Sequence, residues 1–190
     1  MKGVVDVAPI HLDALAELFR ACECPCFCQY WHFEGDKNAW LERCAQSPEV
    51  NESALRADVG RGEARAAGLV ALDDSRVMGW MKLAPRATLP KLRGRSVYRA
   101  LDLGSDDGVL SIACMLVHPD ARGSGIARGL VTAATRMAHD RGARAIEAYP
   151  HARSGLGAHE AWMGPHALLV SLGFKRVAGD DVYPVLRFTV

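Results

Sequence analysis

Residues 22–28 read CECPCFC and place four of the six cysteines of the chain at every second position, with one proline between them. Clustered thiols can bind a metal ion, form disulfides, act as nucleophiles or line an apolar pocket. Zinc sites usually space their cysteines as C-x2-C, which differs from this pattern, although His32 and Cys44 are further donors nearby. The spacing alone therefore leaves these interpretations open, and we assign no metal ligand.

A second stretch whose residues could bind a ligand, RGSGIA, covers residues 122–127 and lies between a strand pattern and a helix pattern. Residues 108–117 are almost all apolar, which is typical of a buried strand, and residues 126–139 repeat apolar side chains at helical spacing. A glycine turn between a strand and a helix can bind an anion, because the first N–H groups of the helix have no internal partner. Arg122 adds a positive charge at the same place.

Two common phosphate-binding motifs do not fit this turn. A nucleotide P-loop requires lysine after its last glycine, whereas Gly125 is followed by Ile126. A dinucleotide fingerprint requires a third glycine, and Arg128 occupies that position. The pyrophosphate of coenzyme A is the remaining candidate for the anion.

The elements that must position these stretches follow from hydrophobic periodicity and from turn residues. We expect helices over residues 10–21, 47–59, 126–139 and 168–172, and another that begins at Asp36. Residues 88–101 contain few apolar side chains, which predicts a surface excursion with a short helix. Strands are expected at residues 4–7, 66–72, 76–84, 108–117, 143–149, 174–178 and 183–190. This order predicts a mixed α/β (α+β) sheet flanked by helices, in a single domain that covers residues 1–190.

The composition argues against several classes of partner. The formal net charge is +1, so we expect no electrostatic binding of nucleic acid or of an anionic membrane surface. The sequence contains no run of about 18 apolar residues and no apolar signal core near its start, so we expect no membrane span and a cytoplasmic location. Thiols stay reduced in that compartment, which argues against disulfides among residues 22–28.

Several motifs together resemble one protein family. Val117-His-Pro119, followed by the turn at residues 122–127, resembles the acyl-CoA signature of the GNAT superfamily of N-acetyltransferases. Residues 168–175, LLVSLGFK, resemble the later helix–Gly–Phe element of that family. The expected order of elements agrees with the family over nearly the whole chain, so the resemblance implies a single-domain GNAT-like fold.

The resemblance implies an acetyl-CoA site. In that family the backbone amides of the turn and of the helix start hold the CoA pyrophosphate. The pantetheine arm pairs with the edge of the preceding strand, here at Leu116 and Val117, and a backbone N–H near these residues donates to the oxyanion. By position, the amides at the pyrophosphate are those of Arg122, Gly123, Ser124, Gly125, Ile126 and Ala127.

The resemblance also implies transfer of an acetyl group to an amine. The ammonium form of an alkyl amine has a pKa of about 10, so the acceptor must lose a proton before it can attack. Glu147 and Tyr149 lie two residues apart on the strand beside the expected slot, so they share a face and are our predicted base and acid. A salt bridge to an arginine is the alternative for Glu147, and a pocket wall is the alternative for Tyr149. Many family members have a tyrosine that acts as the general acid at the position where this chain has Leu169. The identity of the general acid in this chain therefore stays open. His151 and His159 are expected at the surface.

The resemblance also bears on the cysteines. In this family the connection after the first helix often helps to wall the acceptor site, so we predict that residues 22–40 form an apolar, aromatic pocket wall. The sequences QYW at residues 29–31 and YP at residues 149–150 resemble a subgroup whose acceptor is unassigned. We interpret Cys114, in the apolar run, as an inert core thiol.

Three functions compete on these grounds. The first is an acetyl-CoA-dependent N-acetyltransferase that acts on a small-molecule or protein amine. The second is a non-catalytic acyl-CoA-binding module, which Leu169 favours slightly. The third is a metal-binding protein that uses the cysteine stretch. The two C-terminal strands could also pair across a homodimer.

Overall fold

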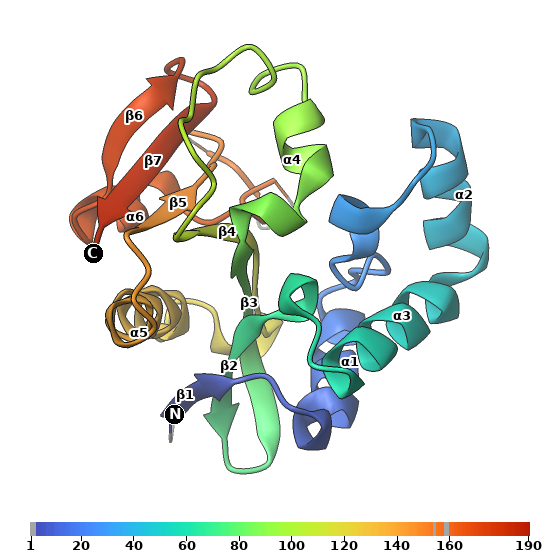
Figure 1. Cartoon of the computed structure of the whole chain (residues 1–190). Coiled ribbons are helices and arrows are strands. Elements are labelled where there is room, and N and C mark those ends of the chain that lie inside the picture. The colour runs from blue at the N-terminus through green and yellow to red at the C-terminus, as the bar shows by residue number, and fades with distance from the viewer. Residues whose placement is uncertain (1–2, 154, 158–159) are drawn as a thin grey trace.

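The computed structural model describes residues 3–153, 155–157 and 160–190, and it contains one sheet of seven strands. The strands are β1 (Gly3–Asp6), β2 (Gly68–Asp73), β3 (Arg76–Pro85), β4 (Val109–Val117), β5 (Ala145–Ala148), β6 (Lys175–Gly179) and β7 (Pro184–Thr189). Their order in the sheet is β1-β2-β3-β4-β5-β7-β6 (Figure 1). Neighbouring strands run antiparallel except for β4 and β5, which are parallel. The predicted mixed α/β sheet is confirmed.

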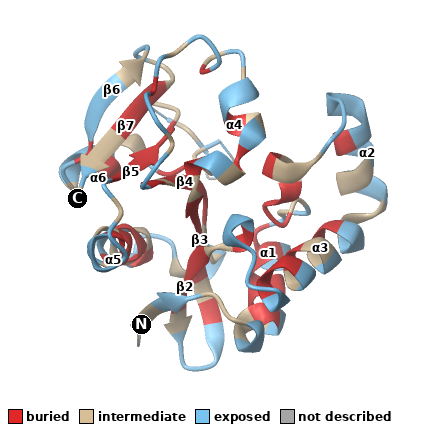
Figure 2. Cartoon of the chain, in the orientation of Figure 1, coloured by how far each residue is buried: buried red, intermediate tan, exposed pale blue. Residues whose placement is uncertain are grey.

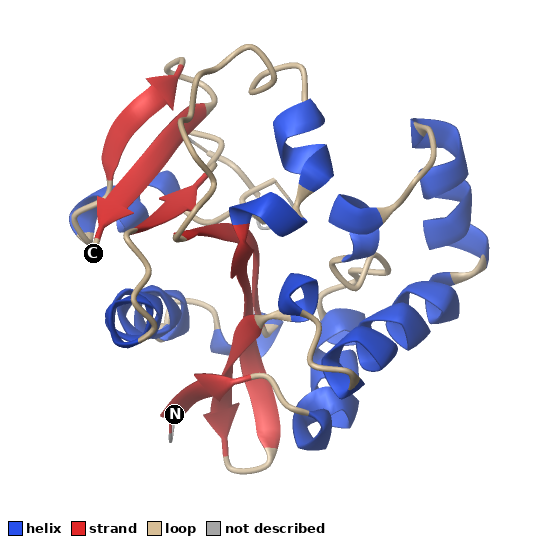
Figure 3. Cartoon of the chain, in the orientation of Figure 1, coloured by secondary structure: helices blue, strands red, loops and turns tan. Residues whose placement is uncertain are grey.

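Helices cover both faces of this sheet, as Figures 1 and 3 show. They are α1 (Leu12–Ala21), α2 (Lys37–Gln46), α3 (Pro48–Gly60), α4 (Pro90–Gly94), α5 (Ile126–Asp140) and α6 (His166–Ser171). The N-terminal helices α1 to α3 lie on one side of β3, and α5 packs against β2, β3 and β4 from the other. The predicted start of α2 is confirmed, because the Asp36 carboxylate accepts a hydrogen bond from the Ala39 N–H at 2.9 Å.

The two parallel strands separate halfway along the sheet. β4 pairs with β5 only over Val109–Ile112, opposite Ala145–Ala148, and its residues 113–117 continue without a β5 partner. β5 ends at Ala148, and Pro150 follows two residues later with no backbone N–H to continue the ladder. One edge of the second half of β4 is therefore open to groups from other parts of the chain.

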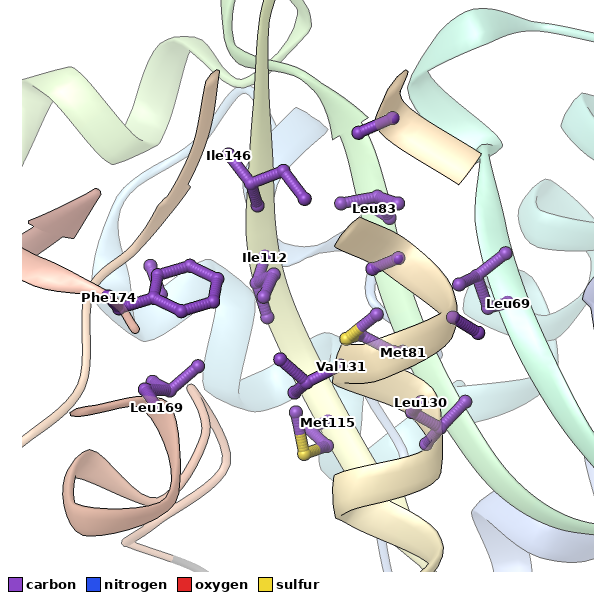
Figure 4. Packing of buried hydrophobic residues seen from close by; sticks show 14 of the residues in the cluster. Leu69, Met81, Leu83, Ile112, Met115, Leu130, Val131, Ile146, Leu169 and Phe174 are labelled. Atoms are coloured by element: carbon purple, nitrogen blue, oxygen red, sulfur yellow. The ribbon is translucent and has the colours of Figure 1, made fainter. Parts of the chain in front are cut away.

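The main core lies between the sheet and α5. Leu130 and Val131 project from α5 onto Met81 of β3 and Ile112 of β4, and Leu169 closes the cluster from α6 (Figure 4). Each such side chain contributes about 1.5–3 kcal/mol when it leaves water. Figure 2 shows burial concentrated on β3, β4 and the inward faces of α1 and α5. This packing fixes the direction in which the start of α5 points.

The predicted short helix within residues 88–101 is confirmed as α4, and most of this stretch is exposed or half-buried, but the prediction missed the burial of three side chains. Leu89, Leu92 and Tyr98 are buried, and they pack with Trp31 and Tyr149 in a separate cluster. Leu89 and Leu92 lie three residues apart around the start of α4, so they share one face of that turn. Among the described residues, no helix combines the length and apolar composition that a bilayer crossing requires.

Candidate functional site

A cavity of about 460 Å³ lies against β4 beyond the point where this strand leaves β5. Its wall combines thiol, aromatic and aliphatic groups with one carboxylate and one guanidinium. The lining residues are Cys22, Glu23, Cys24, Pro25, Cys26, Tyr30, Trp40, Cys114, Met115, Leu116, Val117, Arg122, Ala127, Ala161, Trp162 and Pro165. Its size falls in the range of small-molecule sites. Leu116 and Val117, the predicted neighbours of the pantetheine arm, both line it.

A second hollow of about 350 Å³ lies at the glycine turn and shares Val117, Arg122 and Ala127 with this cavity. The shared residues make the two spaces neighbours along one track, from the edge of β4 to the start of α5. Gly123 and Gly125 have φ values of 80° and 88°, which a residue with a side chain adopts only at a cost. A Cβ at either position would meet open space, so these glycines serve the backbone conformation and the open hollow.

The amides of the turn divide into two groups. The N–H of Arg122 donates to Pro119 O at 3.3 Å, and that of Ser124 donates to Ala121 O at 3.3 Å. The first internal bond of α5 runs from Gly129 N–H to Gly125 O, so helix geometry leaves the N–H groups of its first residues without helical acceptors. Of the six predicted amides, those of Ile126 and Ala127 at the start of α5 therefore have no acceptor within the helix and are available to a bound anion.

The open edge of β4 is covered by three contacts from other segments. Trp31 Nε1 donates to Ala113 O at 3.0 Å, and the thiol of Cys22 lies 3.5 Å from Val117 O. Between them the N–H of Met115 donates to Trp162 O at 2.7 Å. Met115 precedes the two residues near which the oxyanion donor was predicted. An acyl group that uses this N–H must therefore replace the Trp162 carbonyl.

Glu147 lies in a buried ion-pair network. Its Oε2 accepts from Arg86 Nη1 at 2.9 Å, and its Oε1 accepts from Arg187 Nε at 2.9 Å. The side chains of Glu147 and Arg86 are both fully buried, and Arg86 also donates to Asp106. Glu147 is absent from the lining of the 460 Å³ cavity. This geometry favours the salt-bridge interpretation, and the catalytic role of Glu147 stays a prediction.

Tyr149 follows β5 and belongs to the same network. Its hydroxyl donates to Glu147 Oε2 at 2.7 Å and lies 3.1 Å from Ser111 Oγ. Burial raises the pKa of Tyr149 well above its usual value, and the negative charge of Glu147 adds to this, which makes the hydroxyl a weak proton donor. Tyr149 borders a separate polar cavity of about 260 Å³, which shares only Trp162 with the larger one among the residues that line them.

The histidines predicted at the surface fall differently. His151 is half-buried and stacks on Tyr183, with 4.9 Å between the ring centroids. It also borders the polar cavity beside Tyr149. His159 lies outside the described residues.

The cysteine stretch forms one wall of the large cavity, where Cys22, Cys24 and Cys26 meet Tyr30 and Trp40. The predicted aromatic, thiol-lined wall agrees with this placement. Within the described part of the chain, no group of three or more His, Cys, Asp or Glu side chains is arranged to hold a metal ion. Cys114 is buried as predicted, yet it also lines the cavity.

Several site residues were missed by the sequence analysis. Trp162 separates the two cavities, and Arg128 lines the hollow at the glycine turn. Lys82 of β3 lines none of these spaces, although it is fully buried. Its Nζ donates to Arg65 O at 2.5 Å, and burial lowers its pKa. A lysine inside an otherwise apolar strand pattern was the available signal for Lys82. The position of Trp162 depends on contacts far apart in the sequence and had no local signal.

Comparison with known proteins agrees with this architecture. The family model described as the Acetyltransferase (GNAT) family matches residues 13–164. A search of the curated proteins gave no significant match. Among solved structures, PaiA N-acetyltransferase from Thermoplasma acidophilum, in complex with coenzyme A, superposes with a TM-score of 0.58 at 12% identity, over 99% of each chain.

Two further structures come from Brucella melitensis. A ribosomal-protein-alanine N-acetyltransferase has a TM-score of 0.54 at 18% identity, over 98% of this chain and 99% of its own. A GNAT family acetyltransferase in complex with acetyl-CoA has a TM-score of 0.52 at 18% identity, over 98% of this chain and 88% of its own. At these identities the structures support the fold alone. Because the family model covers most of the sequence, the chain belongs to the GNAT acetyltransferase family.

Proposed function

We propose that this acetyltransferase moves the acetyl group of acetyl-CoA to the amine of a small acceptor that carries an apolar or aromatic group. The observation that carries the proposal is the single cavity that joins the edge of β4 to the wall of residues 22–40. Its β4 side suits an acyl-pantetheine arm, and its thiol and aromatic side suits an apolar acceptor. Both substrates would then meet in one space of about 460 Å³.

The cofactor half of the proposal rests on the track along β4. The pantetheine arm would lie beside Leu116 and Val117, and the pyrophosphate would lie in the hollow at the glycine turn. The free N–H groups at the start of α5 and the positive end of this helix favour a bound anion. Arg122 and Arg128 both line the hollow and add positive charge. The structures of similar proteins solved with coenzyme A or acetyl-CoA support the same cofactor.

The acceptor half rests on the opposite wall. Tyr30, Trp40 and Trp162 supply aromatic surface, and Glu23 supplies the one carboxylate among the residues that line the cavity. A carboxylate beside aromatic faces suits an ammonium group that is carried on an apolar body. Similar structures include a ribosomal-protein-alanine N-acetyltransferase and an aminoglycoside 6'-acetyltransferase, so the fold is compatible with different acceptors.

The first test is thermal unfolding with and without acetyl-CoA. At 100 times its dissociation constant, a ligand of the native state raises the free energy of unfolding by about 2.7 kcal/mol, which gives a clear rise in Tm. CoA release is then measured with 2-phenylethylamine, spermidine and a peptide that begins with alanine. We expect release with the aromatic amine. Stabilisation without release from any amine would instead support the non-catalytic acyl-CoA-binding module.

Tyr149→Phe separates a structural from a catalytic hydroxyl. We expect a loss of stability of about 1 kcal/mol, because Glu147 and Ser111 lose a hydrogen-bond partner, and little change in CoA release. Tyr98→Phe is the matched control, since the Tyr98 hydroxyl donates to Tyr149 O at 3.3 Å and also lies outside the large cavity. A steep loss of turnover in Tyr149→Phe alone, with a changed pH profile, would restore Tyr149 as the general acid.

Two expectations from the sequence remain proposals. A homodimer through the C-terminal strands is supported by the edge position of β6 and the exposed Val177 on it. Light scattering of the purified protein measures this oligomeric state. A cytoplasmic location is compatible with the reduced thiols of the structure.

A further inference from the structure

The thiols of the chain are not distributed evenly around the site. Cys22, Cys24 and Cys26 line the acetyl-CoA cavity from one wall, and Cys114 lines it from β4. Cys44 is absent from this lining, and Cys28 is buried with its sulfur accepting from Trp80 Nε1 at 3.2 Å. Cys24 and Cys26 are half-buried residues, whereas Cys22 and Cys28 are buried.

Cys24 and Cys26 form a thiol pair. Their Sγ atoms lie 3.4 Å apart, close enough for one thiol to donate a hydrogen bond to the other sulfur. The segment that holds them is anchored by the buried Asn51, whose Nδ2 donates to Pro25 O at 3.0 Å. Glu23, Phe27 and Cys28 all have positive φ values of 43° to 56°. Backbone strain of this kind in non-glycine residues is maintained only where surrounding contacts impose it, and it is common at functional sites.

Cys26 is the member of the pair with two thiol neighbours, because it lies between Cys24 and Cys28 and can accept a hydrogen bond from each. The hydrogen bond from Cys24, with a further one from Cys28, holds the pKa of the Cys26 thiol well below its usual value. The same bond, together with burial, raises the pKa of Cys24, so Cys24 keeps its proton. A thiolate is the nucleophilic form of cysteine, and it reacts readily with thioesters.

We propose that Cys26 is a site of S-acetylation by the bound acetyl-CoA. The Cys26 sulfur attacks the carbonyl carbon of the thioester, a new C–S bond forms, and the bond between that carbon and the CoA sulfur breaks. The CoA thiolate leaves and takes up the proton that Cys26 had released. One thioester replaces another, so the step needs no oxidant or further reactant. The acetyl group is then transferred from Cys26 to the amine acceptor or, more slowly, the Cys26 thioester is hydrolysed by water.

This inference rests on the proposed function, since it uses the same acetyl-CoA and the same cavity. The wall that carries Cys26 faces the β4 residues Met115, Leu116 and Val117 across one space. A sulfur nucleophile is therefore present where Glu147 and Tyr149, the two predicted catalytic groups, are not. No carboxylate other than Glu23 lines the cavity among the described residues.

The test incubates the full chain with acetyl-CoA and without an amine, and it measures intact mass before and after neutral hydroxylamine, which cleaves thioesters but leaves amides. We expect one acetyl group per chain, lost on hydroxylamine treatment and mapped to Cys26 by peptide analysis. Cys26→Ser should lower this labile acetylation at least about tenfold, since a hydroxyl is not ionised as a thiol is. Cys44→Ser is the matched control and should acetylate as the original chain does.

Thermal unfolding with acetyl-CoA accompanies each sample and distinguishes the failures. If acetyl-CoA stabilises the protein but no labile acetyl group forms, the inference is wrong and the proposed function stands. Labelling of Cys44 or of lysines to the same extent as Cys26 would also overturn it, because it would show reaction without a site. If acetyl-CoA neither stabilises nor labels the chain, both the proposed function and the inference are wrong. Cys26→Ala serves as a second variant if Cys26→Ser does not fold.

Discussion

Gly125→Glu is expected to abolish acetyl-CoA binding while the protein stays folded. Gly125 is the residue before α5 and lies in the hollow at the glycine turn, where a Cβ would meet open space. A glutamate there places a side chain and a negative charge in the proposed pyrophosphate seat, against the positive end of the helix. The measurement is the rise in Tm with acetyl-CoA, which should fall from clear to undetectable.

Two controls separate charge from backbone strain in this experiment. Gly142→Glu makes the same change beyond the other end of α5, where the glycine also has a positive φ and open space. It should lose a similar amount of stability, about 1–3 kcal/mol, and still bind acetyl-CoA. Gly125→Ala tests the strain without the charge and should retain weakened binding. Undiminished acetyl-CoA affinity in Gly125→Glu would refute the assignment of the pyrophosphate seat.

Glu147→Gln is expected to destabilise the protein strongly and to leave acetyl-CoA binding intact. The substitution removes the charge that Arg86 and Arg187 share, and Arg86 is fully buried with no access to water. Loss of one partner from a buried ion pair costs about 3–5 kcal/mol, and the lower end of this range is expected here because Arg86 keeps its second partner, Asp106. For a chain of this size that corresponds to a fall in Tm of roughly 10 °C, which calorimetry measures directly.

The exposed pair of Arg176 and Asp181 provides the control, since Asp181→Asn removes a carboxylate that is almost fully exposed. That change should cost less than about 1 kcal/mol. CoA release, measured at a temperature where Glu147→Gln is still folded, decides its role. Turnover near that of the original chain supports the structural role. A loss of several orders of magnitude, with the loss of the acidic limb of the pH profile, where activity rises with pH, would identify Glu147 as the general base.

Much of the fold is determined by patterns within short stretches, and these were predictable. The apolar run that became β4, the helical spacing of α5 and the glycine turn between them are all local features. The short helix within residues 88–101 was predictable, but the burial of some of its apolar side chains was not, because these are scattered among basic residues without a clear period. Leu89, Leu92 and Tyr98 are buried because they pack against Trp31 and Tyr149, which belong to distant segments of the sequence.

The candidate site likewise has parts that local sequence patterns indicate and parts that depend on residues far apart in the sequence. The spacing of Arg122 and the glycines indicated the hollow at α5, and the density of cysteine and aromatic residues indicated the cavity wall. The environment of Glu147 could not be read in this way, because Arg86 and Arg187 lie 61 and 40 residues away in the sequence. A carboxylate inside a strand marks a site of some kind, but only its partners tell an ion pair from a base.

The covered edge of β4 also bears on the solubility of the protein. Residues 113–117, ACMLV, form an apolar strand segment whose edge has no β5 partner, and such an edge is a template for pairing with other chains. The contacts of Trp31 with Ala113 and of Trp162 with Met115 occupy this edge. The two strands can therefore separate beside the large cavity without exposing an aggregation-prone edge.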